Sequence, residues 1–239
     1  MIPLKEDSEF QRLLESLAND IVDAHIHYRL YQDLIAASNK FPLVIPQSNT
    51  FWSTTLKAHL NTSLFMLTKA YDQDNKALHL SSFLQTIKAN PDLFSEAKFR
   101  VRKKDNPHVD SLASEYRVPD IAKLESDISL CSPSDPLVKT LTIHRGNVLA
   151  HRNAKNTASG KIISKTHPLT FENFELLLNR ALEILNTYSS LFEASTYSKI
   201  AIGADDFSYI FQCVNSAVEK SRLESEEFAK KFSSRTDNS

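Results

Sequence analysis

The sequence is poor in glycine, and this shortage excludes several kinds of fold and site. Only three glycines occur in 239 residues, Gly146, Gly160 and Gly203, far below the roughly 7% that proteins use on average. Phosphate-cradling loops and two-residue hairpins need residues at positive φ, which glycine adopts most readily. The sequence therefore contains no dinucleotide-binding glycine fingerprint and no P-loop, and its composition favours an all-α protein.

Cysteine, long apolar runs and excess charge are also scarce. Cys131 and Cys213 lie far apart and form no metal-binding pair. No run of about 18 apolar residues occurs, and the first residues carry no signal peptide. We therefore expect a cytoplasmic protein that makes no contact with a membrane. The formal net charge of −1 excludes a global positive field, so any contact with nucleic acid has to come from a local basic patch.

Apolar residues that recur every three or four positions predict helices along most of the chain. The predicted helices cover residues 7–39, 48–71, 81–89, 110–116, 120–130, 134–153, 170–194 and 205–232. We expect Ser81 or Ser82 to cap the helix at 81–89, and Ser134 to cap the helix at 134–153. Residues 154–169 are expected to form a loop with a short extended piece.

No internal repeat, flexible linker or clean domain boundary is visible in the sequence. Residues 1–232 are therefore predicted to form a single antiparallel helical bundle, followed by a frayed tail at 233–239. An irregular basic insertion near 95–118 interrupts the bundle. The last helix is increasingly charged, and we expect a solvated face with ion pairs between residues four apart.

The densest basic segment lies inside this insertion. It contains Lys98, Arg100, Arg102, Lys103 and Lys104. Such a cluster can follow an RNA backbone through contacts with its phosphates. It is the local patch that we expect to bind RNA.

The histidines and aspartates form no recognisable metal site. The segment that starts at Asp72 resembles a calcium loop but lacks its central glycine, so a polar turn is predicted. His25 and His27 are two residues apart on a helix and point to different faces. His59 and His79 have no partners at ligand spacing. No metal or cofactor is expected.

The helix predicted at 134–153 gathers side chains suited to proton transfer and phosphate binding. Its last ten residues read HRGNVLAHRN, in which five residues separate Arg145 from His151. The spacing alone arises by chance in a chain of this length, and Arg102 and His108 repeat it. Pro107 lies between that second pair and prevents a continuous helix there.

The sequence resembles the HEPN superfamily, whose signature is an arginine and a histidine separated by four to six residues. The ending Ala-His-Arg-Asn is similar to the core form of the motif, and residues 70–94 (AYDQDNKALHLSSFLQTIKANPDLF) resemble the AbiU2-like branch. The resemblance implies an all-α HEPN-type bundle that acts as a metal-independent endoribonuclease. It also implies a homodimer, an RNA substrate, a role in phage defence or toxin–antitoxin biology, and an antitoxin or regulatory protein as a further partner.

The resemblance implies roles for individual side chains. Arg145 would stabilise the transition state and His151 would transfer protons. Asn147 would orient phosphate or ribose, because the family often has a polar residue after the arginine and Gly146 stands there. Supporting contacts would come from His144, Arg152 and Asn153. On an ideal helix the catalytic pair points about 120° apart, so one helix holds only half of a composite site.

Two other interpretations stay open. A HEPN module without catalytic activity would bind nucleic acid, a nucleotide or a protein partner. In that case Arg145 and His151 would pair with buried carboxylates such as those of Glu172 or Glu175. A purely structural helical adaptor has no positive support in the sequence.

Overall fold

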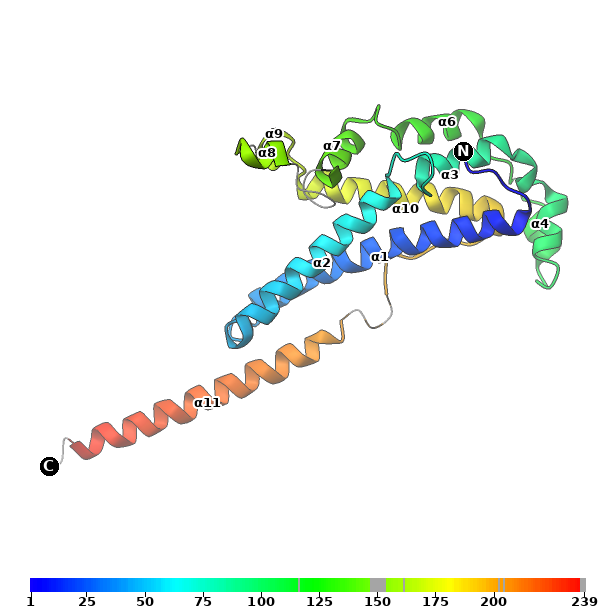
Figure 1. Ribbon diagram of the computed structural model, residues 1–239. Coiled ribbons are helices and arrows are strands. Elements are labelled where there is room, and N and C mark those ends of the chain that lie inside the picture. The colour runs from blue at the N-terminus through cyan, green and yellow to red at the C-terminus, as the bar shows by residue number, and fades with distance from the viewer. Residues whose placement is uncertain (116, 147–153, 161, 202, 204, 237–239) are drawn as a thin grey trace. The chain divides into compact units, whose positions relative to one another are not determined.

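All regular structure that the computed structural model describes is helical (Figure 1). The description covers residues 1–236 apart from 116, 147–153, 161, 202 and 204. Within it no strand occurs, so the prediction of an all-α, HEPN-type helical fold is confirmed.

The α-helices are α1 (Asp7–Lys40), α2 (Asn49–Ala70), α3 (Leu80–Ala89), α4 (Glu96–Arg102), α5 (Val109–Ala113), α6 (Ile121–Leu130), α7 (Pro136–His144), α8 (Ala154–Ala158), α9 (Ile163–Thr166), α10 (Phe171–Glu193) and α11 (Phe207–Thr236). Two short 3-10 helices, η1 (Ile45–Ser48) and η2 (Pro91–Phe94), precede α2 and α4. The loop expected at 154–169 was wrong in part, because α8 and α9 lie there. The basic insertion is also partly helical, since it holds α4 and α5.

The chain divides into two compact units that share α1 and α2. The first unit comprises Met1–His25 and Thr62–Lys199, and the second comprises Ile26–Asn61 and Ile200–Ser239. The single domain expected over residues 1–232 stays a prediction.

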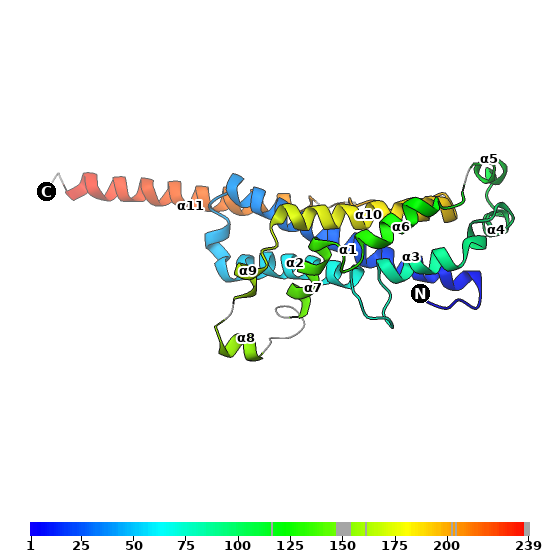
Figure 2. The ribbon, with the colours of Figure 1, turned by 90° about the horizontal axis from the view of Figure 1, so that it is seen from above.

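An aromatic cluster between α1, α3 and α10 forms the centre of the first unit. The ring of Phe10 stacks on Phe83 with 5.0 Å between centroids, and it meets Phe192 edge-on at 4.7 Å. All three side chains are fully buried. Figures 1 and 2 show α10 running antiparallel along the N-terminal half of α1. The buried face of α1 has the predicted spacing: Phe10, Leu14, Leu17, Ile21 and Ala24.

Phe211 of α11 is the centre of the second unit. Its ring is fully buried and lies 4.8 Å from the ring of Trp52 in α2, measured between centroids. Leu34 and Ala37 of α1 and Val44 complete the buried cluster. This core holds the start of α11 against the hairpin formed by α1 and α2.

The C-terminal end of α10 is closed by an arginine from outside the helix. The last carbonyl groups of any helix lack partners within it and attract cations. Arg117 donates to the carbonyl oxygen of Ser190 at 3.0 Å and, through Nε, to that of Leu112 at 2.7 Å. Its guanidinium carbon lies 3.9 Å from the centroid of the Phe99 ring. Burial lowers the pKa of Arg117, partly opposed by the charge of Glu115. The helix then ends at Ala194 in the left-handed region, with φ of 55°.

Replacing Arg117 with alanine is expected to lower the free energy of unfolding by about 2–4 kcal/mol, because buried carbonyl groups lose their donors. Urea denaturation measures the change. Arg117→Lys is expected to recover only part of it, since an ammonium cannot span both carbonyls. Arg100→Ala is the matched control, because Arg100 is partly exposed and, among the described residues, pairs with the surface carboxylates of Glu96 and Asp110. A loss in Arg117→Ala no larger than that in the control would contradict the capping role.

His25 links α1 to the middle of α10. Its Nε2 lies 2.9 Å from the carbonyl oxygen of Leu178. A carbonyl oxygen only accepts, so Nε2 carries a proton and donates. Burial lowers the pKa of His25, and the hydrogen bond to Leu178 offsets part of that effect. The folded protein therefore favours the neutral imidazole.

This lowered pKa predicts acid destabilisation. Unfolded histidine binds a proton at about pH 6.5, above the pKa of folded His25, so the unfolded state gains protons first as the pH falls and the free energy of unfolding decreases. His25→Gln keeps a donor for the carbonyl of Leu178 and is expected to show a smaller decrease between about pH 7.5 and about pH 5.5. Urea denaturation at both pH values tests this, with exposed His108→Gln as control. If the free energy of unfolding of His25→Gln decreased as much as that of the wild type, His25 would be ruled out as a source of the acid destabilisation.

Candidate functional site

Asp135 fixes the start of α7. One carboxylate oxygen accepts from the backbone amides of Leu137 and Val138 at 2.9 and 3.0 Å. The other accepts from the guanidinium of Arg180 in α10 at 3.0 Å. The prediction that Ser134 caps this helix was wrong. The carboxylate one residue later binds two free amides and complements the helix dipole, and its bond with Arg180 joins α7 to α10.

The described part of the helix expected at 134–153 ends soon after α7. His144 closes the α-helix, and Arg145 and Gly146 continue it in one wider, π-type turn. Four residues of the predicted site lie outside the described residues: Asn147, His151, Arg152 and Asn153. The structure therefore places Arg145 and His144 of the predicted set.

Arg145 is paired with Asp72, which lies in the connection between α2 and α3. Its Nη1 donates to the Oδ1 of the Asp72 carboxylate. The same oxygen accepts from the backbone amides of Gln73 at 2.7 Å and Asp74 at 3.3 Å. The side chain of Asp72 is 10% exposed, whereas that of Arg145 is 36% exposed. A guanidinium has five donors in a planar fork, so an arginine held in this way can present a second edge to a phosphate.

The connection that holds Asp72 is itself bonded to the core of the first unit. The hydroxyl of Tyr71 donates to the backbone carbonyl of Leu177 in α10 at 3.0 Å, and the side-chain Nε2 of Gln73 donates to the backbone carbonyl of Cys131 at 3.1 Å. Burial raises the pKa of Tyr71 well above its usual value, so this donor keeps its proton. The predicted polar turn is present, but sequence reasoning missed Asp72 as a site residue. The only available signal was an acidic segment, Asp-Gln-Asp, directly after a helix in the family-like stretch.

His79 lies at the other end of this connection and caps α3. Its Nδ1 accepts from the backbone amide of Ser82 at 3.2 Å, and the Ser82 hydroxyl accepts from the amide of His79 at 3.0 Å. The expectation that Ser81 or Ser82 caps this helix was wrong, because Ser82 is its third residue and bonds back to the cap. Burial lowers the pKa of His79, opposed by the negative charge of Asp72.

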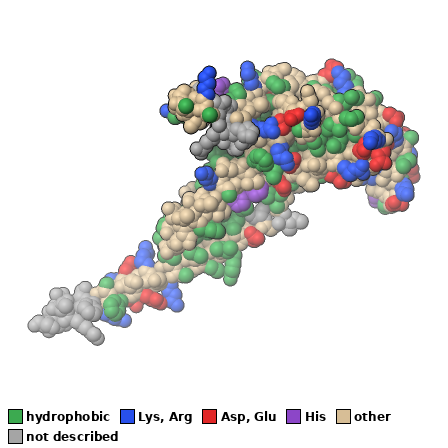
Figure 3. All heavy atoms as spheres, in the orientation of Figure 1, with side chains coloured by type: hydrophobic (Ala, Val, Ile, Leu, Met, Phe, Trp, Pro, Cys, Tyr) green, Lys and Arg blue, Asp and Glu red, His purple; other side chains and the backbone are tan. Residues whose placement is uncertain are grey.

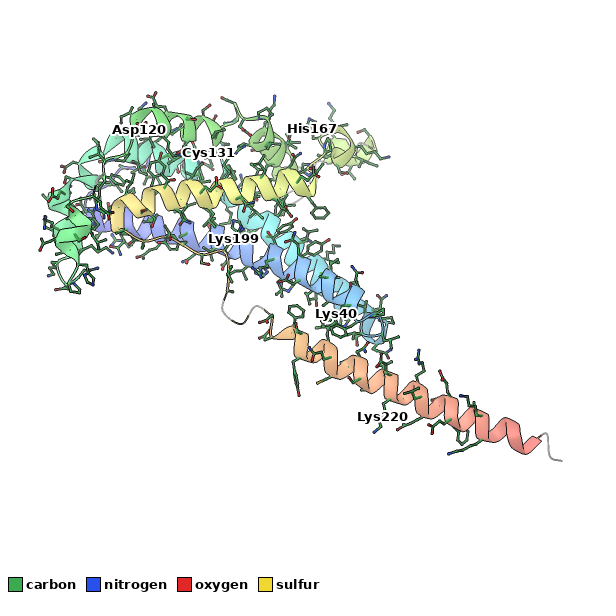
Figure 4. All side chains as sticks on the ribbon, turned by 180° about the vertical axis from the view of Figure 1, so that it is seen from behind. Lys40, Asp120, Cys131, His167, Lys199 and Lys220 are labelled. Carbon is green, nitrogen blue, oxygen red and sulfur yellow. The ribbon has the colours of Figure 1, made fainter. Side chains whose placement is uncertain are left out.

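His144 is directed to the backbone rather than to Arg145. Its Nε2 donates to the carbonyl oxygen of His167 at 2.6 Å, and its side chain is buried. Figure 4 labels His167 where α9 leads into α10. His144 therefore joins the end of α7 to the segment before α10, which is a positioning contact.

Two lysines and an arginine of the predicted RNA-binding segment are bonded to carboxylates of the same chain. Lys98 lies 3.0 Å from Asp7 and 2.9 Å from Asp92. Arg100 pairs with Glu96 and Asp110, and Lys103 lies 3.9 Å from Glu193. Figure 3 shows basic and acidic side chains intermixed around α4. These carboxylates neutralise much of the positive charge, and RNA binding by Lys98, Arg100, Arg102, Lys103 and Lys104 stays a prediction.

Arg102, in the middle of this segment, has a structural role. Its guanidinium donates to the carbonyl oxygens of Leu93 and Phe192, both at 2.9 Å. It also lies over the Phe192 ring, 3.9 Å from the centroid. Burial lowers its pKa to about 10. The second Arg–His pair of the sequence, Arg102 and His108, thus contains an arginine that closes the end of α10.

Among the described residues, no group of three or more His, Cys, Asp or Glu side chains is placed to hold a metal ion. His27 and His59 do meet across α1 and α2, with 2.8 Å between their Nδ1 atoms. Sequence reasoning missed this pair because its members lie on different helices. Burial lowers the pKa of His59, and the charge of His27 adds to the effect. In the described part of the chain no helix is long and apolar enough to cross a membrane.

The fold and the site together define a class of protein: an all-helical domain of the HEPN type, with an arginine at the end of a capped helix. The chain belongs to the HEPN_AbiU2 family (AbiU2), whose model matches residues 7–209. This family is associated with abortive infection, a form of phage defence. No curated protein and no solved structure matches the chain. The predicted AbiU2-like membership is confirmed.

A double-mutant cycle tests the coupling between Asp72 and Arg145. Asp72→Asn, Arg145→Gln and the double variant are expected to give a coupling energy of about 1 kcal/mol in urea denaturation, because one partner is buried and the other partly exposed. Asp74→Asn combined with Arg145→Gln is the control, since Asp74 bonds to the amide of Lys76 instead. A coupling energy near zero for Asp72 and Arg145 would show that the pair does not hold in solution.

Proposed function

We propose that the protein is a metal-independent endoribonuclease that acts in phage defence or toxin–antitoxin biology. The observation that carries the proposal is the placement of Arg145. A capped helix presents it, a buried carboxylate holds it, and 36% of its side chain stays exposed. Membership of a family associated with abortive infection supports the biological setting.

The proposed reaction uses the ribose hydroxyl of the RNA as nucleophile. A base removes the proton of the 2′-OH, the oxygen attacks the adjacent phosphorus, and the 5′-oxygen leaves with a proton from an acid. The products are a 2′,3′-cyclic phosphate and a 5′-hydroxyl. His151 is assigned to proton transfer, because histidine titrates near neutral pH. Arg145 donates to the phosphate oxygens as their negative charge grows.

Each chain supplies one Arg145 and one His151, and two copies form the complete site. The buried Asp72 carboxylate orients Arg145 through one edge of the guanidinium and leaves another edge for phosphate. Asn147, His144, Arg152 and Asn153 are proposed as supporting residues. The bond between His144 and the His167 carbonyl suits it to position the end of α7. An antitoxin or regulatory protein is a further partner in this proposal.

The second candidate function is a HEPN module without catalytic activity, which binds nucleic acid, a nucleotide or a protein partner. The Asp72–Arg145 pair is the observation that favours it. A carboxylate already satisfies this arginine within the chain, as the non-catalytic interpretation requires, although its position in the sequence differs from that of Glu172 or Glu175. The two candidates differ in one measurable result, which is RNA cleavage.

Purified protein with single-stranded RNA in EDTA is expected to produce 2′,3′-cyclic phosphate ends between about pH 5 and about pH 8. Arg145→Ala and His151→Ala are each expected to lower the cleavage rate by about a hundredfold or more. Asp72→Asn is expected to have a smaller effect, because it removes the positioning contact and keeps the guanidinium. Mass spectrometry of the RNA ends, sampled over time, measures cleavage by the wild type and by the three variants.

His108→Ala provides the matched control, because His108 belongs to the other Arg–His pair and is exposed. It is expected to cleave RNA at the wild-type rate. A wild-type protein that yields no cyclic phosphate at any pH in this range would exclude the ribonuclease and favour the binding module. Cleavage that EDTA abolishes would contradict the metal-independent mechanism.

A further inference from the structure

The C-terminal half of α11 extends beyond the core of the second unit. Residues 219–231 are all exposed, and Figure 1 shows this part of the helix continuing past the turn between α1 and α2. The family match ends at residue 209, in the first turn of α11, so the extension lies outside what this chain shares with the family model.

Packing in the described structure and the helix's own ion pairs give this extension little support. Its ion pairs include Lys220 with Glu224 at 3.9 Å and Arg222 with Glu226 at 3.7 Å. Exposed pairs of this kind add little to helix stability. Isolated helices of this length are marginal in water. Burial of one face against a partner surface would therefore stabilise this extension.

The side of α11 that packs in the second unit continues into the exposed part. Phe207, Phe211, Val214 and Val218 follow one another at steps of four, three and four, and they are buried or half-buried. The same steps lead on to Ser221, Ser225 and Phe228. Phe228 is 68% exposed. Alternation of three- and four-residue steps is the pattern with which one helix packs along another.

The order of large and small residues on this seam favours a second copy of the helix in antiparallel orientation. With Ser225 opposite the Phe228 of the second copy, each large side chain meets a small one, and the twofold axis makes the contact twice. A parallel pair would instead place Phe228 against Phe228 and Ser225 against Ser225. Such a pair matches large with large and leaves a gap beside it.

The charges that flank the seam agree with the antiparallel arrangement. Glu224 and Lys231 occupy the same flank, seven residues apart. Equivalent flanks of two antiparallel helices meet, so in this register Glu224 of each copy lies beside Lys231 of the other. The parallel alternative places Glu224 near the uncharged Ala229. Figure 3 shows acidic and basic side chains along this part of the helix, and Figure 4 labels Lys220 on it.

We propose that the exposed half of α11 is a self-association surface, which pairs antiparallel with α11 of a second copy through Ser225 and Phe228 and is flanked by Glu224–Lys231 ion pairs. This surface belongs to the second unit, whereas Arg145 belongs to the first. The inference does not rest on the proposed ribonuclease activity.

Charge exchange on the full chain tests the proposal, with sedimentation equilibrium as the measurement. Glu224→Lys and Lys231→Glu each convert two attractions into two repulsions, and each is expected to raise the dissociation constant about tenfold or more. The double variant is expected to associate like the wild type. An equimolar mixture of the two single variants is also expected to associate, because the copies then carry opposite charges on the seam.

Lys230→Glu is the matched control for Lys231→Glu. Both lysines follow a glutamate by four residues, Glu226 or Glu227, so the helix itself is perturbed alike, but Lys230 faces away from the seam. The control is expected to associate like the wild type. Phe228→Ala is expected to weaken association about a hundredfold, because the contact occurs twice.

Two results would overturn the proposal. One is a molecular mass in solution that is the same as that of the wild type in Glu224→Lys, Lys231→Glu and Phe228→Ala. The other is a mixture of the single variants that fails to associate, which would exclude the antiparallel register. RNA cleavage is scored separately, so loss of activity in Arg145→Ala without a change in mass bears only on the ribonuclease.

Discussion

Hydrogen bonds to the backbone carbonyls of α10 organise the first unit. The hydroxyl of Tyr71 and the imidazole of His25 donate to the adjacent carbonyls of Leu177 and Leu178 in the middle of the helix. These carbonyls already take part in the helix, so the side chains use their second lone pairs. Each donor is buried, and losing its acceptor would leave a desolvated polar group. The neighbouring helix and connection are thereby held in one register along α10.

The site depends on the same helix through two routes. Tyr71 is bonded to α10 and directly precedes Asp72, so the position of the carboxylate follows from that bond. Arg180 of α10 binds Asp135, which starts the helix that leads to Arg145. Both partners of the ion pair are therefore placed by α10, although they lie 73 positions apart in the sequence.

The periodicity of apolar residues was sufficient to predict the longer helices, because burial of one face is what stabilises them. It predicted the buried face of α1 but not the short helices α4, α8 and α9. It failed at the caps, where Asp135 and His79 replaced the expected serines. A cap depends on which oxygen or nitrogen reaches a free amide, and neighbouring polar residues are equivalent in the sequence.

The basic segment and the ion pair show a second limit of the sequence. A count of lysines and arginines gives the charge of a segment but not the carboxylates that face it, such as Asp7, 91 residues from Lys98. Arg102 and Arg145 have the same spacing to a histidine, yet one closes a helix end and the other meets a carboxylate beside a turn. Long-range pairing decides between these roles, and it follows from the packing of α10 rather than from local spacing.

The two proposed self-contacts would together restrict how copies of the chain assemble. The proposed composite site and the proposed α11 seam would each relate identical surfaces by a twofold axis. If one axis serves both, two copies close into a dimer, and the first contact raises the effective concentration for the second. If the axes differ, the contacts join different copies, and the assembly grows to a tetramer or a longer array. Weakening the α11 contact would then lower the mass of the assembly without separating the two halves of the Arg145 site. In the closed dimer, weakening the α11 contact would weaken the Arg145 site as well.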